Sequence, residues 1–264
     1  MSAGPASDLD STTRDALAEL LLTLADDEFV IGFWDSEWTG IAPILEEDVA
    51  TSSISQDEIG HARALYELLA DLTDDDADRI AFGRDPEAYR HSALLNHART
   101  DWAFSVARRY LYETADAIRL EALAGSSYAP LAALVAKMRR EERYHLMHLD
   151  AWLRRLAEAG GSAHERLSEG LTRLWPDAMT IFTPLAGERV LVAAGILPEP
   201  MEQLRERWLA RVMPVMQRLG LPIPSTAQQE GAPSEGGRSE QTDDFRWLHG
   251  EFTMVARSED GASW

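Results

Sequence analysis

Glu58-Ile59-Gly60-His61 and Glu142-Arg143-Tyr144-His145 are the most informative motifs of this 264-residue sequence. A Glu and a His three residues apart project from the same side of a helix. A charged Glu on a core-facing side is costly unless a partner neutralises it. Both pairs nevertheless lie on apolar stripes of helical period, which read Ile54, Glu58, His61, Leu65 and Met138, Glu142, His145, Leu149. The two stretches therefore predict buried, metal-ligating pairs on two different helices.

Two further acids complete the predicted set. Helices joined by a short turn run antiparallel, so residues equally distant from the turn lie at the same height. Reflecting Glu58 through Pro43 gives Glu28, and reflecting Glu142 through the turn at 125–130 gives Glu113. Two Glu-x-x-His pairs plus one Glu from each of two other helices are the ligands of di-iron and di-manganese four-helix bundles. The sequence thus predicts an all-α, ferritin-like four-helix bundle with additional C-terminal helices and six metal ligands: Glu28, Glu58, His61, Glu113, Glu142 and His145.

The predicted ligands also suggest which metal they would hold. Their four carboxylates carry four negative charges, which two divalent ions would balance. Carboxylate and imidazole donors suit iron or manganese, and the sequence has no cysteine to recruit softer metals. The alternatives are polar residues at helix ends, or a buried, hydrogen-bonded Glu–His pair without metal. Asp27, Asp57 and Glu141 lie about 100° off the stripes, so we expect them behind the ligands or in solvent. Tyr110 lies on the stripe that leads to Glu113, where a core tyrosine is favoured over a hydrogen bond to a ligand.

The composition excludes several other classes of function. A net charge of −20 argues against nucleic-acid binding, which requires a basic face. No stretch approaches the roughly 20 apolar residues of a membrane span. Residues 1–10 lack the basic and apolar regions of a signal peptide, so a cytoplasmic location is expected. No G-x-G-x-x-G loop is present to bind a nucleotide cofactor, so electrons for a redox reaction would have to come from another protein.

The chain is expected to consist of a helical domain over residues 1–219, a flexible linker over 220–243 and a C-terminal helix and tail over 244–264. The linker prediction rests on enrichment in Gly, Pro, Ser, Gln and Glu. A long connection between the two helical hairpins is usual in ferritin-like bundles. Helices are predicted over about 12–39, 44–72, 94–124 and 130–159, and then over about 162–175, 176–194 and 198–219.

The residues around these motifs resemble one family. Ser36–Asp48, Gln56–Arg63 and Glu141–His145 are similar to the C subunit of ring 1,2-phenylacetyl-CoA epoxidase, in the ferritin-like di-iron carboxylate superfamily. The resemblance extends over nearly the whole chain, including Leu24–Glu28 and Gly236–Arg238. It implies a component of a multicomponent monooxygenase that epoxidises the ring of phenylacetyl-CoA in aerobic phenylacetate degradation.

The same resemblance implies partners and cofactors. The catalytic di-iron centre of that family belongs to a paralogous A-type subunit, and the C-type subunit is its structural partner, with a metal site that is often degenerate. All six predicted ligands are present here, which leaves open a di-iron site in this chain. A small B-type subunit, with a reductase that carries flavin and an iron–sulfur cluster and is fed by NADPH, completes the system. A self-sufficient di-iron or di-manganese oxidase and an iron-storage protein of the same fold remain the alternatives, and no catalytic residue is assigned.

Overall fold

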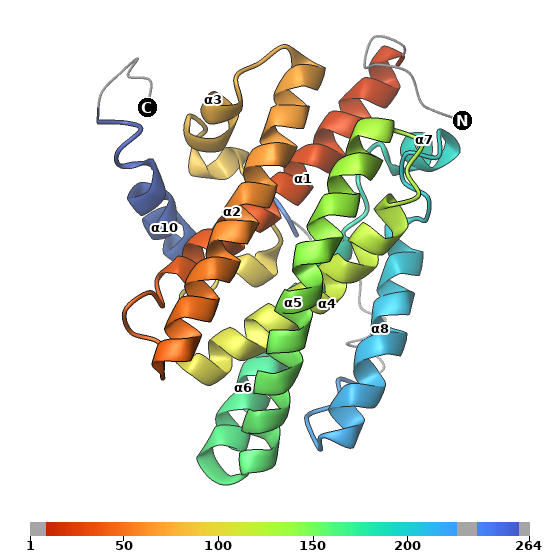
Figure 1. Ribbon diagram of the computed structural model, residues 1–264. Helices are drawn as coiled ribbons and strands as arrows, with labels where there is room; N and C mark the ends of the chain where they lie inside the picture. Colours follow the sequence, from red (N-terminus) through yellow and green to blue (C-terminus); the bar gives the residue numbers. More distant parts are fainter. Residues whose placement is uncertain (1–8, 226–236, 259–264) are drawn as a thin grey trace.

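Two helical hairpins form the body of the protein (Figure 1). The computed structural model describes residues 9–225 and 237–258, and these ranges contain helices and no strand. The long helices are α1 (Ser11–Ser36), α2 (Leu45–Thr73), α4 (Trp102–Leu123) and α5 (Ala129–Ala159). α1 packs along α2, and α4 packs along α5. The predicted all-α, ferritin-like bundle is therefore confirmed. In the described part of the chain, no helix combines the length and hydropathy needed to cross a bilayer.

The connection between the hairpins contains short helices: α3 (Ala77–Phe82), η2 (Pro86–Ala88) and η3 (Ala93–Asn96). Asp74 caps the C-terminus of α2 and adopts the left-handed conformation with φ of 56°. α4 begins later than the predicted residue 94. Asp101 caps it, because its carboxylate accepts a hydrogen bond of 2.9 Å from the backbone nitrogen of Phe104. The predicted crossover between the hairpins is thus present, and the N-terminal cap decides where the third long helix starts.

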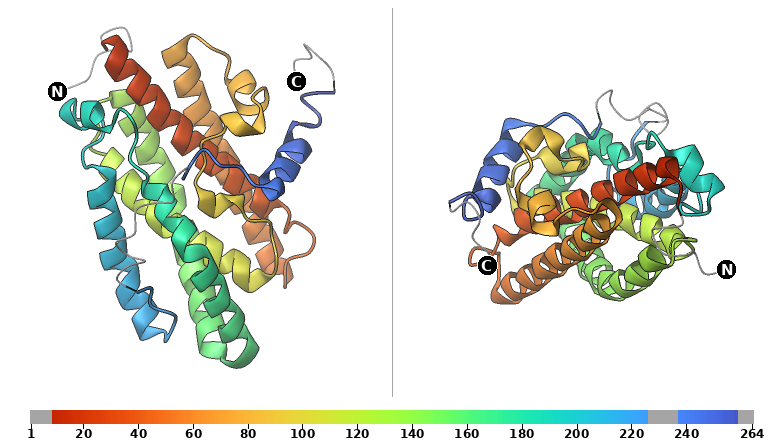
Figure 2. Two further views of the ribbon diagram at one scale, coloured as in Figure 1. Left: turned by 180° about the vertical axis from the view of Figure 1, so that it is seen from behind. Right: turned by 90° about the horizontal axis from the view of Figure 1, so that it is seen from above.

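The C-terminal elements are α6 (Gly161–Ala178), η4 (Met179–Phe182), α7 (Glu188–Ala193), α8 (Met201–Arg218) and α10 (Asp243–Thr253). α6 and α8 pack against α4, while α10 packs on the α1 side of the bundle (Figure 2). The prediction of a continuous helix over 176–194 is wrong. α6 continues through Pro176 to its end, and the chain then breaks around Pro184, which cannot continue a helix because it lacks an N–H group.

α1 and α2 come unusually close at Gly32. A Cβ atom there would lie 2.8 Å from Ile59 Cγ1 and 3.2 Å from the backbone oxygen of Ser55. It would also lie 3.1 Å from the Cβ atom of Glu58. Gly32 follows Glu28 by one helical turn. Its missing side chain therefore allows the backbone approach that places the acids of α1 and α2 side by side.

The C-terminal segment is fastened to the bundle by a buried ion pair. Arg238 donates hydrogen bonds of 2.9 and 3.0 Å to the two carboxylate oxygens of Asp27 on α1. Asp27 also accepts from Arg119, at 2.7 Å, and from the backbone nitrogen of Ser92, at 2.7 Å. Asp27 is fully buried, rather than placed behind the ligands or in solvent as expected. Arg238 lies within the predicted linker, of which residues 226–236 are outside the described residues, and the division into three parts remains a prediction.

Candidate metal centre

The four long helices bring all six predicted residues together in the core. Each is buried, with a relative exposure of at most 4%. They form two overlapping groups, and within each group the potential ligand atoms lie within 4.8 Å of one another. The groups share Glu58 and Glu142. The first group consists of Glu28, Glu58, His61 and Glu142, and the second group consists of Glu58, Glu113, Glu142 and His145.

The two histidines direct the same ring nitrogen at the acids. His61 Nδ1 lies 3.3 Å from Glu28 Oε2, 3.3 Å from Glu142 Oε1 and 3.7 Å from Glu58 Oε2. His145 Nδ1 lies 3.4 Å from Glu58 Oε1, 3.4 Å from Glu142 Oε1 and 3.8 Å from Glu113 Oε1. The two ring centroids are 6.4 Å apart. The donor atoms therefore converge on two neighbouring points, with a shared carboxylate from α2 and another from α5.

The outer nitrogen of each histidine meets a second carboxylate from the opposite helix. His61 Nε2 lies 2.8 Å from Glu141 Oε2, and His145 Nε2 lies 3.3 Å from Asp57 Oδ2. These outer acids are part-exposed, whereas the inner ones are buried. A carboxylate on the outer nitrogen fixes the orientation of an imidazole and increases its basicity toward a metal. Asp57 and Glu141 thus lie behind the predicted ligands, as their positions beside the stripes indicated.

Several atoms of the cluster have no hydrogen-bond partner among the described residues. They are Glu58 Oε2, Glu113 Oε2, both carboxylate oxygens of Glu142 and His145 Nδ1. A buried polar atom without a partner costs about 1–3 kcal/mol, and more when it is charged. A cation between the carboxylates would satisfy these atoms. The donor set therefore fits a metal ion for two reasons: its atoms are carboxylate oxygens and imidazole nitrogens, and several of them have no hydrogen-bond partner among the described residues.

Protons neutralise the cluster when no ion does. Burial alone would lower the pKa of His145, but the carboxylates of Glu142 and Glu58, each 3.4 Å from its Nδ1, outweigh it and raise that pKa to about 10. The pKa of His61 is raised for the same reason, against burial and through Glu142, Glu28 and Glu58. Burial and the charges of Glu142 and Glu58 raise the pKa of Glu113 well above its ordinary value. Binding of a divalent ion to these residues would accordingly release protons.

Arg109 is a charged residue of the cluster that the sequence-based prediction missed. It lies on α4 one turn before Glu113, and it is 5% exposed. Its Nη2 donates to Glu58 Oε1 and Glu113 Oε1, and its Nη1 donates to Asp35 Oδ2. Its neighbour Arg108 donates to the same aspartate, at 3.2 Å, and contacts none of the six predicted ligands through a hydrogen bond in the described structure. The signal for Arg109 was its spacing of four residues from Glu113.

A tyrosine also contacts the cluster, but it is not the one on the predicted stripe. Tyr112 donates a hydrogen bond of 3.0 Å to Glu28 Oε1. Tyr110 is buried in the core, as the favoured interpretation had it. Burial and the charge of Glu28 raise the pKa of Tyr112 well above its ordinary value, so the phenol remains a donor. Tyr112 was missed because it immediately precedes Glu113 and so lies about 100° around the helix.

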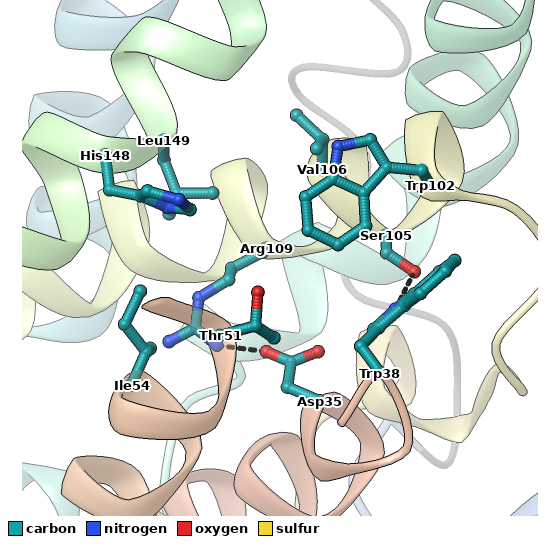
Figure 3. Close-up of a pocket in the computed structure, with 10 residues that line it drawn as sticks. All are labelled: Asp35, Trp38, Thr51, Ile54, Trp102, Ser105, Val106, Arg109, His148 and Leu149. Atoms are coloured by element: carbon teal, nitrogen blue, oxygen red, sulfur yellow. Dashed lines mark hydrogen bonds and ion pairs between the residues drawn. The ribbon is translucent and has the colours of Figure 1, made fainter. Parts of the chain in front are cut away.

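A small pocket lies beside Arg109 (Figure 3). Its volume is about 20 Å³. A water molecule requires about 10–15 Å³ and an apolar cavity that holds benzene measures about 150 Å³, so this pocket accommodates water but not an aromatic ring. Trp38 Nε1 donates a hydrogen bond of 3.0 Å to Ser105 Oγ across its edge. The lining consists of Asp35, Trp38, Thr51, Ile54, Trp102, Ser105, Val106, Arg109, His148 and Leu149.

Comparison with known proteins agrees with the motifs. The chain is 28% identical over 249 residues to the C subunit of 1,2-phenylacetyl-CoA epoxidase of Escherichia coli (strain K12), which covers 94% of this chain and 99% of the relative. It is 25% identical over 197 residues to the A subunit of the same epoxidase, which covers 72% of this chain and 62% of that relative. The family described as "Phenylacetic acid catabolic protein" matches residues 1–264. Because this match spans the whole chain, the protein belongs to the phenylacetic acid catabolic protein family.

Proposed function

We propose that this protein is the C-type component of a multicomponent phenylacetyl-CoA epoxidase and the structural partner of its catalytic A-type subunit. The observation that carries the proposal is the similarity to the C-type relative over 99% of its length, against 62% for the A-type relative. The small B-type subunit, the reductase with its NADPH, flavin and iron–sulfur cluster, the substrate and a cytoplasmic location belong to the proposal through the same resemblance. A self-sufficient oxidase and an iron-storage protein find no comparable support.

The surroundings of the cluster favour a structural role over oxidation of an aromatic ring. The pocket beside Arg109 has about 20 Å³, far less than a phenyl ring needs. A second cavity of about 420 Å³ reaches Glu142 from the surface, and Arg139, Arg140, Arg143 and Arg211 contribute to its lining. This second cavity opens to solvent and carries charged side chains among its apolar ones, whereas oxidation of an arene requires a site that excludes water. Neither space resembles a dry pocket for the ring.

An exposed apolar surface supports a protein partner. Leu45 and Val49 at the start of α2 are 74% and 65% exposed, and Tyr144 and Met147 on α5 are 68% and 64% exposed. The two helices lie side by side at the front of the bundle (Figure 1). They are joined there by a hydrogen bond of 2.6 Å between a histidine of α5 and a glutamate of α2. Clustered exposed apolar side chains mark interaction surfaces, and we assign this one to the A-type subunit.

Iron is the metal that we propose for the cluster. The six residues are the ligand types of a carboxylate-bridged pair of iron ions, and no thiolate competes for the site. Bound iron would supply redox chemistry, while the protein supplies the carboxylates, the oriented imidazoles and the exclusion of water. In a structural partner, bound metal would instead tie α1, α2 and α5 together through charges that protons otherwise neutralise. The number of ions that bind depends on Arg109, because its guanidinium already contacts two of the carboxylates.

Co-expression with an A-type subunit tests the proposed role. We expect the two chains to co-purify as a complex, and we expect epoxidation of phenylacetyl-CoA only when both are present with the remaining components. Leu45→Asp together with Met147→Asp should abolish co-purification, because the charges would be buried at the interface. Ile223→Asp is the matched control, since Ile223 is 46% exposed and lies outside α2 and α5. Oxidation of the substrate by this chain without an A-type subunit would contradict the structural role.

A further inference from the structure

The two groups of ligands are not equivalent, because Arg109 occupies only one of them. Its Nη2 donates to Glu58 Oε1 and Glu113 Oε1. These are two of the three oxygens that face His145 Nδ1 in the second group, at 3.4 and 3.8 Å. The third is Glu142 Oε1, which lies 3.4 Å from His145 Nδ1 and also faces His61 Nδ1. The oxygens that face His61 Nδ1 in the first group are Glu28 Oε2, Glu58 Oε2 and Glu142 Oε1. The guanidinium thus binds the two oxygens that face only the second group and leaves the three oxygens around His61 Nδ1 to another cation.

Arg109 is held in this position from behind. Its Nη1 binds Asp35 on α1 (Figure 3). Arg108 binds the same aspartate at 3.2 Å. A guanidinium is a rigid planar fork, so three carboxylates on its two terminal nitrogens leave it little freedom to rotate. It also cannot lose its charge within a protein. A metal ion could enter the second group only if Arg109 gave up its hydrogen bonds to two buried carboxylates, and breaking a buried ion pair costs about 3–5 kcal/mol.

We infer that the cluster holds one divalent ion, in the first group, and that the Arg109 guanidinium is the permanent second cation in the second group. This inference rests on the proposed iron site and sets its stoichiometry. A guanidinium has no accessible change of oxidation state and offers no open coordination position. A chain with one ion and one guanidinium therefore lacks the metal pair, which agrees with a structural partner rather than an oxidising component.

Titration of the full-length protein with one metal at a time tests the inference. The chain is stripped with chelator and titrated with Fe(II) under anaerobic conditions, and with Mn(II) in a parallel series. Bound metal is measured by calorimetry and elemental analysis. We expect one equivalent in the wild type and two in Arg109→Ala, which opens the second group. Electron paramagnetic resonance should show an isolated Mn(II) signal in the wild type and a spin-coupled signal in Arg109→Ala.

Arg108→Ala is the matched control. Arg108 is adjacent, fully buried and bound to the same aspartate, but its hydrogen bonds go to Asp35 and to the backbone oxygen of His97. We expect it to retain one equivalent of metal. Two equivalents of metal bound to the wild type would overturn the inference but would still support the iron site. This measurement does not require Arg109→Ala to fold. One equivalent in a folded Arg109→Ala would also overturn it. No metal in any folded variant would overturn the inference together with the iron site, while association with the A-type subunit is measured separately.

Discussion

Replacing Arg238 with Met should destabilise the protein by about 3 kcal/mol. The substitution keeps the length of the side chain but removes the hydrogen bonds of 2.9 and 3.0 Å to Asp27. Breaking a buried ion pair typically costs about 3–5 kcal/mol. We expect the lower end, because Asp27 keeps Arg119 at 2.7 Å and a backbone N–H group. For a chain of this size, the melting temperature should fall by about 6–12 °C.

The loss should also depend on pH. Burial opposes ionisation of Asp27, but the charges and hydrogen bonds of Arg238 and Arg119 outweigh it and hold the pKa of this carboxyl below its ordinary value of 3.8. A depressed pKa of the folded state contributes stability above the unfolded value, and this contribution is lost as the pH falls through the folded pKa. The difference between wild type and Arg238→Met should therefore be constant from pH 7 to 5 and should shrink below about pH 4.

Urea unfolding at a series of pH values measures both effects. Arg246→Met is the matched control, because this arginine lies in the same C-terminal segment but pairs on the surface with Glu87, at 3.2 Å. Exposed pairs contribute about 0–1 kcal/mol, so the control should remain close to the wild type. A loss below about 1 kcal/mol for Arg238→Met, or a loss equal to that of Arg246→Met, would refute the assignment of Arg238 as a buried anchor.

Three further predictions concern the helices, a buried histidine and the outer acids. Gly32→Ala should lower the free energy of unfolding in urea by about 1–3 kcal/mol, because its Cβ would lie 2.8 Å from a side chain of α2. Gly60→Ala is the control: the space around Gly60 is open, so this change should stabilise the protein by up to about 1 kcal/mol. Similar effects of the two substitutions would contradict the close approach of α1 and α2. Burial lowers the pKa of His91 from 6.5 to about 4. The free energy of unfolding should therefore decrease by about 3 kcal/mol as the pH falls from about 6.5 to about 4, because the unfolded chain takes up a proton that the folded protein does not. His91→Gln should remove that fall, and an unchanged pH dependence would speak against a buried neutral imidazole. Glu141→Gln should weaken Mn(II) binding about 10–100-fold, because this acid supports His61 in the first group. Asp57→Asn should leave the affinity close to that of the wild type, and equal losses would count against a single ion in the first group.

The helical period of the sequence was sufficient to predict much of the bundle. The acids on the stripes, Glu28 and Glu113, were found by reflection through turns, and the structure places both beside the Glu-x-x-His pairs. The reflection works because antiparallel helices of equal rise keep the same height on both sides of a short turn. Asp57 and Glu141 also lie behind the predicted ligands, since a residue next to a core-facing one projects to the edge of the buried stripe.

Other features could not be predicted from the period alone. Arg109 and Tyr110 are adjacent in the sequence, and the core-facing side of a helix is wide enough to include either of them. Hydropathy alone therefore assigns the core position to Tyr110 rather than to Arg109. The charge of Arg109 is tolerated only because three carboxylates from α1, α2 and α4 surround it, which is a property of the tertiary structure. The buried ion pair of Arg238 also depends on the tertiary structure and could not be predicted from the local sequence. Its neighbours have the composition of a linker, and its partner Asp27 is distant in the sequence.

The pairing of Arg238 with Asp27 has a consequence for synthesis of the protein in the cell. The two residues are 211 positions apart in the chain. At a typical elongation rate of about 5–20 residues per second, Asp27 is added to the chain roughly ten seconds or more before Arg238. During this interval α1 can pair with α2, but a buried carboxylate still lacks one of its two cations. Until translation has passed Arg238, the nascent bundle therefore lacks the roughly 3 kcal/mol that this ion pair contributes to its stability.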